Sequence, residues 1–333
     1  MKKLKGLLAL ILCAAVCIPL CGCDTIDRIF GNDRYGDGYY DNGYYDNGYY
    51  DNGYYDNGYN NNYNDPYADN HYYNNVPQLV SHYIDVGQGD SEFIEFPDGQ
   101  TMLIDAGPAE SGNTVVNYIK NLGYSKIDYV VATHPHTDHI GGMKKVINSF
   151  DVGKIFMPKA TSTTSTYSNL LEAIAKKGKK VTTTNAGTNI FRGNDSSLSV
   201  KVLAPVGNDY ESLNDYSIVL KVTYGKVRLL YMGDAEQISE NEILKKNYDV
   251  SADVIKVGHH GSSSSSGKKF VNKVKPQYAI MSLGAGNDYH HPHNQVVNRW
   301  IKAGAEIIRT DECGDIVLTT DGDQFNIDTE KGG

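Results

Sequence analysis

Three histidines and one aspartate within six residues form the group in this sequence that is best suited to chemistry. The motif is His134-Pro135-His136-Thr137-Asp138-His139, and it follows residues 127–132, a largely apolar run that is typical of a buried strand. His134 and His136 lie two positions apart, so on an extended loop both imidazoles can face one metal ion. Asp138 and His139 follow at once and can turn to a second ion. Nitrogen and oxygen donors without thiolates favour zinc, iron or manganese.

This motif resembles the His-x-His-x-Asp-His signature of the metallo-β-lactamase superfamily. The resemblance implies a four-layered αββα fold, and the alternating strand-like and helix-like stretches of residues 79–333 also indicate a layered α/β domain. It further implies that His134 and His136 bind a first divalent ion, while Asp138 and His139 bind a second. We expect these two ions to be zinc or manganese.

The resemblance implies further ligands later in the chain. Asp234 ends the predicted strand 227–232, where the family places a carboxylate that bridges the two ions and offsets their mutual repulsion. His259 and His260 follow the predicted strand 252–257, and one of them should complete the second site. We expect His259 to be the ligand because it lies nearer to the strand, which leaves His260 to meet the substrate.

One ligand of the family pattern is missing. Many members supply a third histidine to the first ion from a loop before the bridging aspartate, but no histidine lies between His139 and His259. The corresponding place holds Asn214-Asp215-Tyr216-Ser217, so Asn214, Asp215 or a water molecule would have to substitute. This departure weakens the prediction of zinc in the first site and argues against β-lactamase activity.

Further phrases resemble the extracytoplasmic hydrolase domain of the ComEC-type competence proteins, over roughly residues 80–322. In order they are Asp85-Val86-Gly87-Gln88-Gly89-Asp90-Ser91, Leu103-Ile104-Asp105-Ala106-Gly107, Asn214-Asp215-Tyr216-Ser217-Ile218-Val219-Leu220, Gly258-His259-His260-Gly261-Ser262, Tyr289-His290-His291-Pro292 and Arg309-Thr310-Asp311. The resemblance implies degradation of a DNA strand by a metal-bound hydroxide. No second apolar span follows the N-terminal one, so we expect a stand-alone relative without the membrane channel of that family.

Several side chains within these phrases have alternative roles. His291 is a candidate substrate contact or general acid, and with Asp138 and His260 it makes up the predicted catalytic set. Asp105 either orients a histidine ligand, as carboxylates commonly do, or binds metal itself. The serines at 262–266 either donate hydrogen bonds to a phosphate or belong to a mobile loop.

The charge of the chain neither demands nor excludes an anionic substrate. The formal net charge is −9; three lysines lie in residues 1–23 and ten aspartates with two arginines in residues 24–78, which leaves −4 for residues 79–333. Two divalent cations would cancel that surplus. Four lysines flank the motif loops and either follow a nucleic-acid backbone or are simply solvated, namely Lys144, Lys145, Lys268 and Lys269.

The first 23 residues are predicted to be a lipoprotein signal peptide. A basic start precedes an apolar run that is shorter than the ~20 residues needed to span a bilayer. The run ends in Leu20-Cys21-Gly22-Cys23, which resembles a lipobox, so we expect cleavage before Cys23 and lipidation of its thiol. Acylation there would anchor the protein stably to the outer face of a bacterial membrane. The alternatives are an ordinary signal peptide or an uncleaved anchor.

Residues 24–78 are predicted to form a disordered tether. Tyr-Tyr-Asp-Asn-Gly occurs four times between residues 39 and 58, and no aliphatic side chain lies between Phe30 and Ala68. Such a segment has little to bury, and its Asp-Gly and Asn-Gly steps favour turns. The alternatives are adhesion through the tyrosines or calcium binding by the repeats. Beyond residue 23 the only cysteine is Cys313, which excludes an internal disulfide or a cysteine zinc cluster.

Three functions are consistent with this sequence. The first is an extracytoplasmic metal-dependent phosphodiesterase or nuclease acting on DNA through a hydrolase domain at residues 79–333. The second is a hydrolase of another ester, a lactone or an amide at the same metals. The third is a non-catalytic surface-binding lipoprotein, against which the nearly complete ligand set argues. The sequence predicts no protein partner.

Overall fold

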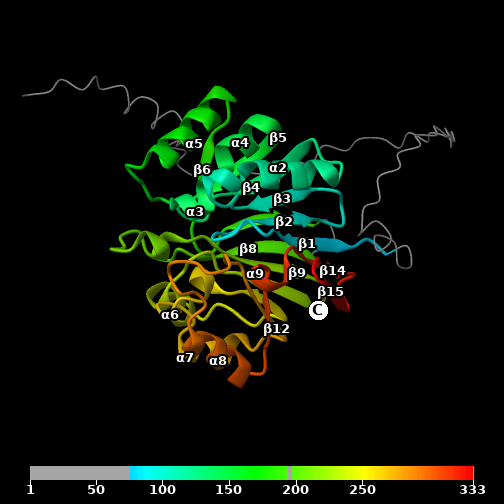
Figure 1. The fold of residues 1–333 in the computed structure, drawn as a ribbon, viewed down its shortest axis with the longest axis vertical. Coiled ribbons are helices and arrows are strands. Elements are labelled where there is room, and N and C mark those ends of the chain that lie inside the picture. The colour runs from blue at the N-terminus through cyan, green and yellow to red at the C-terminus, as the bar shows by residue number, and fades with distance from the viewer. Residues whose placement is uncertain (1–75, 194–196, 333) are drawn as a thin grey trace, which may run out of the picture.

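The computed structural model describes residues 76–193 and 197–332. Two β-sheets pack face to face, and helices cover the outer face of each, which gives four αββα layers (Figure 1). This arrangement confirms the predicted fold class. The predicted signal peptide and all but the last residues of the predicted tether lie outside the described residues. In the described part of the chain, no helix combines the length and the apolar character that a membrane crossing requires.

The first sheet has eight strands in the order β15-β14-β1-β2-β3-β4-β5-β6. In chain order its strands are β1 (Leu79–Tyr83), β2 (Glu92–Glu95), β3 (Thr101–Ile104), β4 (Lys126–Val131), β5 (Asp151–Met157), β6 (Val181–Thr183), β14 (Ile316–Thr320) and β15 (Phe325–Thr329). The helices over its outer face are α2 (Gly112–Asn121), α4 (Met143–Ser149) and α5 (Ser165–Lys176), with the short α3 (Thr137–Ile140) beside them.

The second sheet has seven strands in the order β13-β12-β11-β10-β9-β8-β7. Its strands are β7 (Asn189–Arg192), β8 (Leu198–Ala204), β9 (Val219–Tyr224), β10 (Val227–Tyr231), β11 (Val254–Lys256), β12 (Tyr278–Met281) and β13 (Glu306–Arg309). Its outer helices are α6 (Gln237–Lys245), α7 (Lys268–Val274) and α8 (Asn294–Lys302). Short helical turns complete the chain: η2 (Ala109–Ser111), η3 (Leu213–Tyr216), η4 (Gly258–Gly261) and α9 (Thr310–Cys313).

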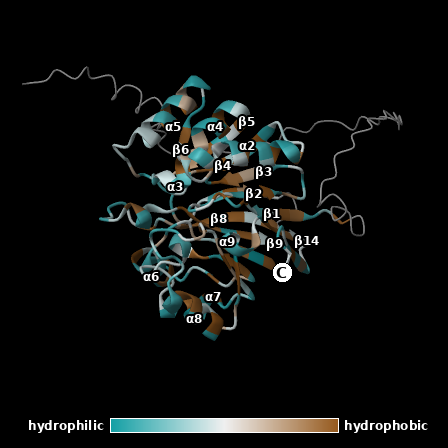
Figure 2. Cartoon of the chain, viewed as in Figure 1, coloured by the Kyte–Doolittle hydropathy of each residue, from teal (hydrophilic) through white to brown (hydrophobic). Residues whose placement is uncertain are grey.

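Along each strand, side chains point alternately to the core between the two sheets and to the core beneath the helices. Each sheet is therefore packed on both of its faces. In β3, Met102 and Ile104 belong to the core between the sheets, whereas Leu103 belongs to the core beneath the helices of the first sheet. In β10, Leu229 faces the other sheet and Leu230 faces the helices. Successive side chains of a strand point to opposite faces, so two apolar cores require nearly continuous apolar strands. Figure 2 shows this apolar character concentrated on the strands of the two sheets, between the outer helices.

The strands predicted at residues 127–132, 227–232 and 252–257 correspond to β4, β10 and β11, whereas β5, β6, β7 and α7 were not predicted. Strand β5 begins Asp-Val-Gly, a sequence that favours a turn. Gly153 nevertheless lies in the strand. Glycine is required there because a Cβ atom would lie 2.2 Å from the carbonyl oxygen of Asp128 on the neighbouring strand. Helix α7 has only seven residues, too few to give a clear periodic pattern.

Parallel pairing brings the predicted metal ligands to one edge of the sandwich. Strands β3, β4 and β5 are parallel in the first sheet, and β10, β11 and β12 are parallel in the second. The motif at residues 134–139 follows β4, Asp234 follows β10, and the histidine pair at 259–260 follows β11. Because all these strands end at the same edge, loops from both sheets meet there.

Candidate metal centre

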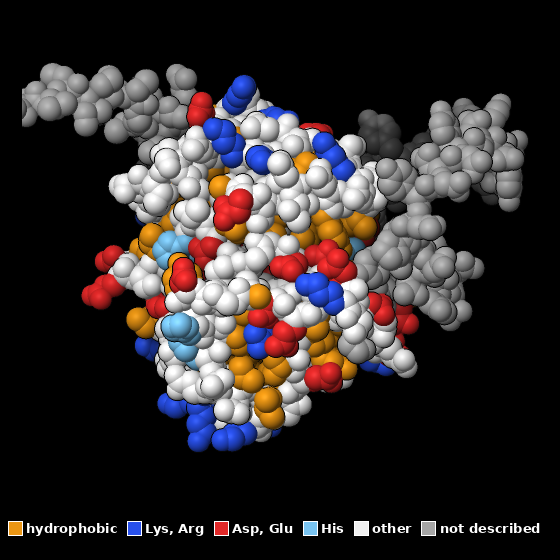
Figure 3. Space-filling view, in the orientation of Figure 1, with side chains coloured by type: hydrophobic (Ala, Val, Ile, Leu, Met, Phe, Trp, Pro, Cys, Tyr) orange, Lys and Arg blue, Asp and Glu red, His pale blue; other side chains and the backbone are white. Residues whose placement is uncertain are grey.

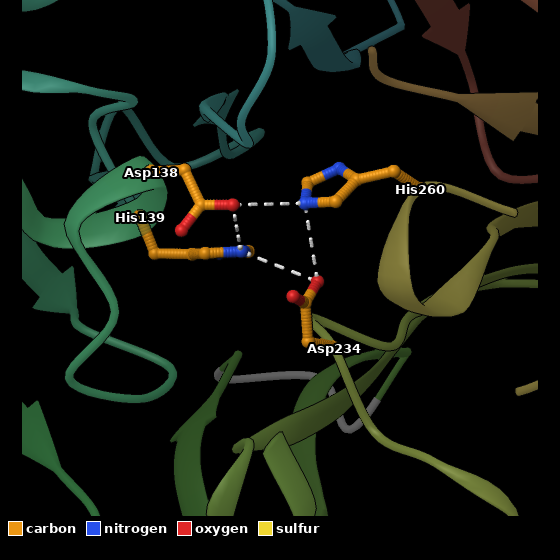
Figure 4. Close-up of side chains that lie close together, drawn as sticks. All are labelled: Asp138, His139, Asp234 and His260. Atoms are coloured by element: carbon orange, nitrogen blue, oxygen red, sulfur yellow. Dashed lines mark ion pairs between the residues drawn. The ribbon is translucent and has the colours of Figure 1, made fainter. Parts of the chain in front are cut away.

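Four side chains converge at this edge from three different loops. Asp138 and His139 come from α3, Asp234 follows β10, and His260 comes from η4 (Figure 4). Asp234 Oδ1 lies 3.2 Å from His139 Nε2 and 3.4 Å from His260 Nε2. Asp138 Oδ2 lies 3.4 Å from the same His260 nitrogen. We call these four residues the second group.

The second group fits a divalent cation. His139 Nε2, His260 Nε2 and Asp234 Oδ1 are buried and have no hydrogen-bond partner among the described residues. A buried polar atom without a partner costs about 1–3 kcal/mol, so three of them facing one another need a common partner. Imidazole nitrogens and carboxylate oxygens are the donors that zinc and manganese accept.

A first group lies on the other side of Asp234. It consists of His134, His136 and Asp234 itself. His134 Nε2 lies 3.7 Å from Asp234 Oδ2 and 3.0 Å from His136 Nδ1. The two oxygens of Asp234 are therefore divided, with Oδ1 facing the second group and Oδ2 facing the first. A carboxylate that bridges two ions has this orientation.

The structure places His260, and not the expected His259, in the second group. His260, with its side chain only 1% exposed, lies in the second group and is too deep to meet the substrate first. His259 Nε2 instead lies 3.8 Å from Asp234 Oδ2, the oxygen that faces His134. Both residues have left-handed backbones, with φ of 50° and 51°. This tight turn sends consecutive imidazoles to different sides of Asp234, which spacing along the sequence does not reveal.

Of the two suggested substitutes for the missing histidine, Asp215 is engaged elsewhere. Asp215 Oδ1 accepts the backbone N–H groups of Glu236 and Ser239, so this carboxylate serves the start of α6. Asn214 Nδ2 donates to Glu236 Oε1 at 3.2 Å and lies 3.4 Å from His259 Nδ1. Asn214 also lines the pocket together with Asp234 and His259, and its Oδ1 is buried without a hydrogen-bond partner among the described residues, so it stays a candidate substitute.

Asp105 fixes the motif loop and one of its histidines. Its Oδ1 accepts the backbone N–H of Thr133 at 2.8 Å, and its Oδ2 accepts the Thr133 hydroxyl at 2.6 Å. The same Oδ2 lies 2.8 Å from His139 Nδ1. Both oxygens are thus engaged, and His139 keeps its Nε2 for the second group. Of the two roles considered for Asp105, the geometry favours orientation over direct metal binding.

A buried ion pair orients His260 in a similar way, and it was not predicted from the sequence. His260 Nδ1 contacts Ser282 O at 2.8 Å and Asp90 Oδ1 at 3.2 Å. Asp90 Oδ2 in turn lies 2.5 Å from Nζ of Lys256, whose side chain is fully buried. The available signal was a lysine inside an apolar strand, Val254-Ile255-Lys256-Val257, because a buried ammonium must be paired.

The carboxylates attract positive charge to the second group. Burial alone lowers the pKa of an imidazole, but Asp234 and its neighbours outweigh burial here. They raise the pKa of His139 well above its usual value and that of His260 to about 10. Burial likewise opposes ionisation of Asp234, yet His139 and His260 hold its pKa well below the usual range. A proton can meet this demand for positive charge, and so can a divalent cation.

The serines after η4 hold the histidine turn. Ser264 Oγ lies 3.0 Å from His259 Nδ1, and the Ser265 hydroxyl donates to Gly258 O at 2.7 Å. The backbone N–H of Ser266 donates to Glu240 Oε1 at 2.5 Å. These bonds are internal to the protein, so the structure favours neither the phosphate-binding role nor the mobile loop that we considered.

Members of both groups line a pocket of about 360 Å³, namely His136, Asp138, Asp234 and His260. Gln88, Thr137, Tyr289 and His291 form part of its wall, so the predicted catalytic residues Asp138, His260 and His291 share one pocket. Burial and the neighbouring His260 lower the pKa of His291 to about 4, which favours a substrate contact over a general acid at neutral pH. A larger cavity of about 760 Å³ lies between edge strands β13 and β15, and its lining includes none of these histidines.

Two kinds of sequence comparison relate this chain to known proteins. Residues 84–285 match the family model described as the metallo-beta-lactamase superfamily. ComE operon protein 3 of Bacillus subtilis is 31% identical over 250 residues, which cover 70% of this chain and 32% of that protein. Competence protein ComA of Neisseria gonorrhoeae is 29% identical over 232 residues, covering 69% of this chain and 30% of that protein. Recombination protein 2 of Haemophilus influenzae is 25% identical over 252 residues, which cover 73% of this chain and 29% of that protein. The chain thus spans about a third of the length of these relatives.

Two solved structures that match this chain have low sequence identity to it. The E377D mutant of CmlA beta-hydroxylase has a TM-score of 0.47 and 17% identity, covering 73% of this chain and 53% of that one. A diphosphatase from the PhnP family has a TM-score of 0.44 and 14% identity, and the match covers 73% of this chain and 98% of that one. The family model matches more than half of the chain, and the protein therefore belongs to the metallo-β-lactamase superfamily, with competence proteins among its relatives.

Proposed function

We propose that this superfamily hydrolase is a two-metal phosphodiesterase that cleaves DNA outside the cytoplasmic membrane. The division of the two Asp234 oxygens between two groups of histidines carries the proposal. Two ions in such an arrangement can stabilise both the attacking and the leaving oxygen during displacement at phosphorus. The competence and recombination proteins among the relatives support DNA as the substrate class.

The chain's own residues would hold the two ions unequally. Asp138, His139, His260 and Asp234 would hold the second ion, and His134, His136, His259 and Asp234 would hold the first. Bound divalent ions lower the pKa of water toward ~7 and so supply a nucleophile at neutral pH. Asp105 and Asp90 engage the Nδ1 atoms of their histidines, which directs each Nε2 into the centre. His291, in the pocket wall, is placed to donate a hydrogen bond to a phosphate oxygen.

The charge of the loaded centre favours an anionic substrate. Asp90, Asp138, Asp234 and Glu236 all have a pKa below the usual value, so four negative charges face the single positive charge of Lys256. Two divalent ions would bring four positive charges and leave these groups with one net positive charge. On the face shown in Figure 3, lysine and arginine side chains gather over the helices at the two ends, while acidic side chains and histidines lie between them.

The proposed location depends on Cys23, so it can be tested apart from catalysis. In bacteria that express the full chain, metabolic labelling with a radioactive fatty acid should mark the protein, and Cys23→Ser should abolish the label because the acceptor thiol is gone. Cys313→Ser is the matched control and should keep the label. Equal labelling of the Cys23→Ser variant would show that Cys23 is not the anchor.

Hydrolysis of phosphodiesters is the central expectation. The purified protein loaded with manganese or zinc should cleave DNA oligonucleotides and bis-p-nitrophenyl phosphate. An Asp138→Ala, His139→Ala double variant should lose more than the roughly 10- to 100-fold that removal of an outer-sphere partner costs, because two ligands of the second ion are gone. Initial rates at saturating metal give the measurement.

Asp98→Ala serves as the control for this experiment, since Asp98 lies in an exposed turn between β2 and β3. It should retain the parent rate. A protein that binds two ions but cleaves a lactone or a β-lactam in preference to either phosphodiester would contradict the proposed substrate class while leaving the metal centre intact.

The two adjacent histidines should have separable effects on metal binding. His260→Ala should reduce the bound metal toward one ion per chain, because it removes a buried donor of the second group. His259→Ala should leave the second ion in place and weaken only the first. Mass spectrometry of bound metal and calorimetric titration would measure this, with the exposed His290→Ala as control. Identical losses in the His259 and His260 variants would contradict the assignment.

Asp105→Asn should weaken metal affinity without changing the backbone conformation. Asp105 has a φ of 55°, a left-handed conformation that asparagine also tolerates. The amide keeps the shape but loses the charge and one acceptor, so His139 is held less firmly. We expect a metal dissociation constant roughly 10- to 100-fold higher in calorimetry. Asp98→Asn is the matched control, and an unchanged affinity in Asp105→Asn would restrict Asp105 to holding the loop.

A further inference from the structure

An aromatic ring stands at the mouth of the metal pocket. Tyr289 is 64% exposed, although aromatic side chains are usually covered. The other large apolar side chains that are exposed in the described residues, Val76, Ile238 and Ile301, do not line this pocket, whereas Tyr289 does. Most of this ring therefore faces solvent at the pocket.

Tyr289 ends a series of rings that begins in the second group. The rings of His260 and His291 are stacked, with centroids 6.3 Å apart and an interplanar angle of 27°. The rings of His291 and Tyr289 are stacked in the same way, 5.6 Å apart at 24°. The inner face of Tyr289 therefore lies against His291, and its exposure leaves the remainder of the ring to solvent. The series leads from the proposed metal site to the surface in two steps.

Hydrogen bonds hold the loop that carries Tyr289. Asn287 Nδ2 donates to Gly284 O at 3.0 Å and to His291 O at 2.7 Å, while its Oδ1 accepts the His291 N–H at 3.0 Å. The loop is also joined to the site, because the Gly284 N–H donates to Gln88 Oε1 at 3.2 Å. An exposed ring on a loop fixed in this way is already oriented for stacking, so less conformational entropy is lost when a ligand binds.

We propose that Tyr289 is a stacking platform for an unpaired nucleobase next to the phosphodiester that is cleaved. This inference rests on the proposed function and names the form of DNA that the site accepts. A positive metal centre recognises the phosphate, and a flat aromatic ring within two ring-to-ring steps recognises a base. Stacking on aromatic side chains is tolerant of base identity, which suits cleavage without sequence preference.

The same geometry selects for single strands. In a duplex both faces of a base are covered by its neighbours, so a base can meet Tyr289 only when the strand is open or at an end. Steps of 5.6 and 6.3 Å separate Tyr289 from His260, so the stacked base belongs to a nucleotide beside the reacting one. Tyr289 is therefore a specificity-determining residue that acts on substrate binding and not on the chemical step.

The test compares Tyr289→Leu with Tyr289→Phe in the metal-loaded protein. Leucine removes the aromatic face, whereas phenylalanine keeps it, and the exposed position makes both substitutions compatible with folding. Binding of a cleavage-resistant phosphorothioate oligothymidylate, measured by fluorescence anisotropy, should weaken roughly 10- to 100-fold in Tyr289→Leu and by less than about twofold in Tyr289→Phe. With cleavable single strands, KM should rise by a similar factor while kcat stays unchanged.

Abasic and duplex ligands complete the design. An abasic strand should bind the parent protein and Tyr289→Leu equally, and a covalently closed circular duplex, which has no end, should show little difference between them. Equal oligothymidylate affinity in the parent and Tyr289→Leu, or no binding by either, would overturn the inference. A change that persists with abasic strands would instead indicate sugar recognition and would equally overturn it.

The two proposals can fail separately. Hydrolysis of bis-p-nitrophenyl phosphate needs no base, so its cleavage together with unchanged oligonucleotide binding in Tyr289→Leu would retain the phosphodiesterase and reject the platform. Loss of oligonucleotide binding in Tyr289→Leu, in a protein that cleaves no phosphodiester, would retain the platform and reject the hydrolysis.

Discussion

The burial of several carboxylates at one edge of the sandwich is the constraint on which the rest of this site depends. Asp90, Asp105 and Asp234 are at most 1% exposed, and an isolated carboxylate in such a place is strongly disfavoured. Lys256 pairs with Asp90, and Thr133 with His139 satisfies Asp105. Within the described residues the basic side chains within 4 Å of the Asp234 carboxylate are the imidazoles on either side of it. Its charge is therefore the one that bound cations would neutralise most effectively.

The fold holds the surrounding backbone in conformations that ordinary side chains avoid. Asp105, His259 and His260 all have φ between 50° and 55°, where a non-glycine residue costs of order 1–3 kcal/mol. The loop between β1 and β2 also approaches the motif closely, because a Cβ atom on Gly89 would lie 2.3 Å from Asp138 O. Two packed sheets can maintain such conformations since each loop begins at a strand whose position is fixed by both cores. The sandwich thus supplies the rigidity that metal ligands need.

The sequence revealed the part of the site that is compact along the chain. The residues from His134 to His139 and the aspartate after β10 could be recognised because each lies directly after an apolar strand. The assignment of His259 and His260 could not be read correctly, because it depends on a left-handed turn. The role of Lys256 was not predicted for a different reason. The apolar pattern of β11 predicts a buried strand, but the ion pair with Asp90 follows only from how β1, β2 and β11 lie relative to one another. The strand β5 was missed because Gly153 is needed for a close contact that lies outside its own segment.

The two halves of the metal centre are not equivalent, and this asymmetry bears on how a substrate enters. The second group has two buried imidazoles, each held at Nδ1 by an outer carboxylate, and two carboxylates of its own. The first group has the half-buried His136, whose Nδ1 faces His134, and lacks the third histidine of the family pattern. His259 stands on its open side with its side chain 23% exposed, next to the pocket wall that carries His291 and Tyr289. If His259 completes the first site as proposed, an ion there would lie nearer to solvent than one in the second site. Its more exposed ligand would stand beside the wall from which Tyr289 extends.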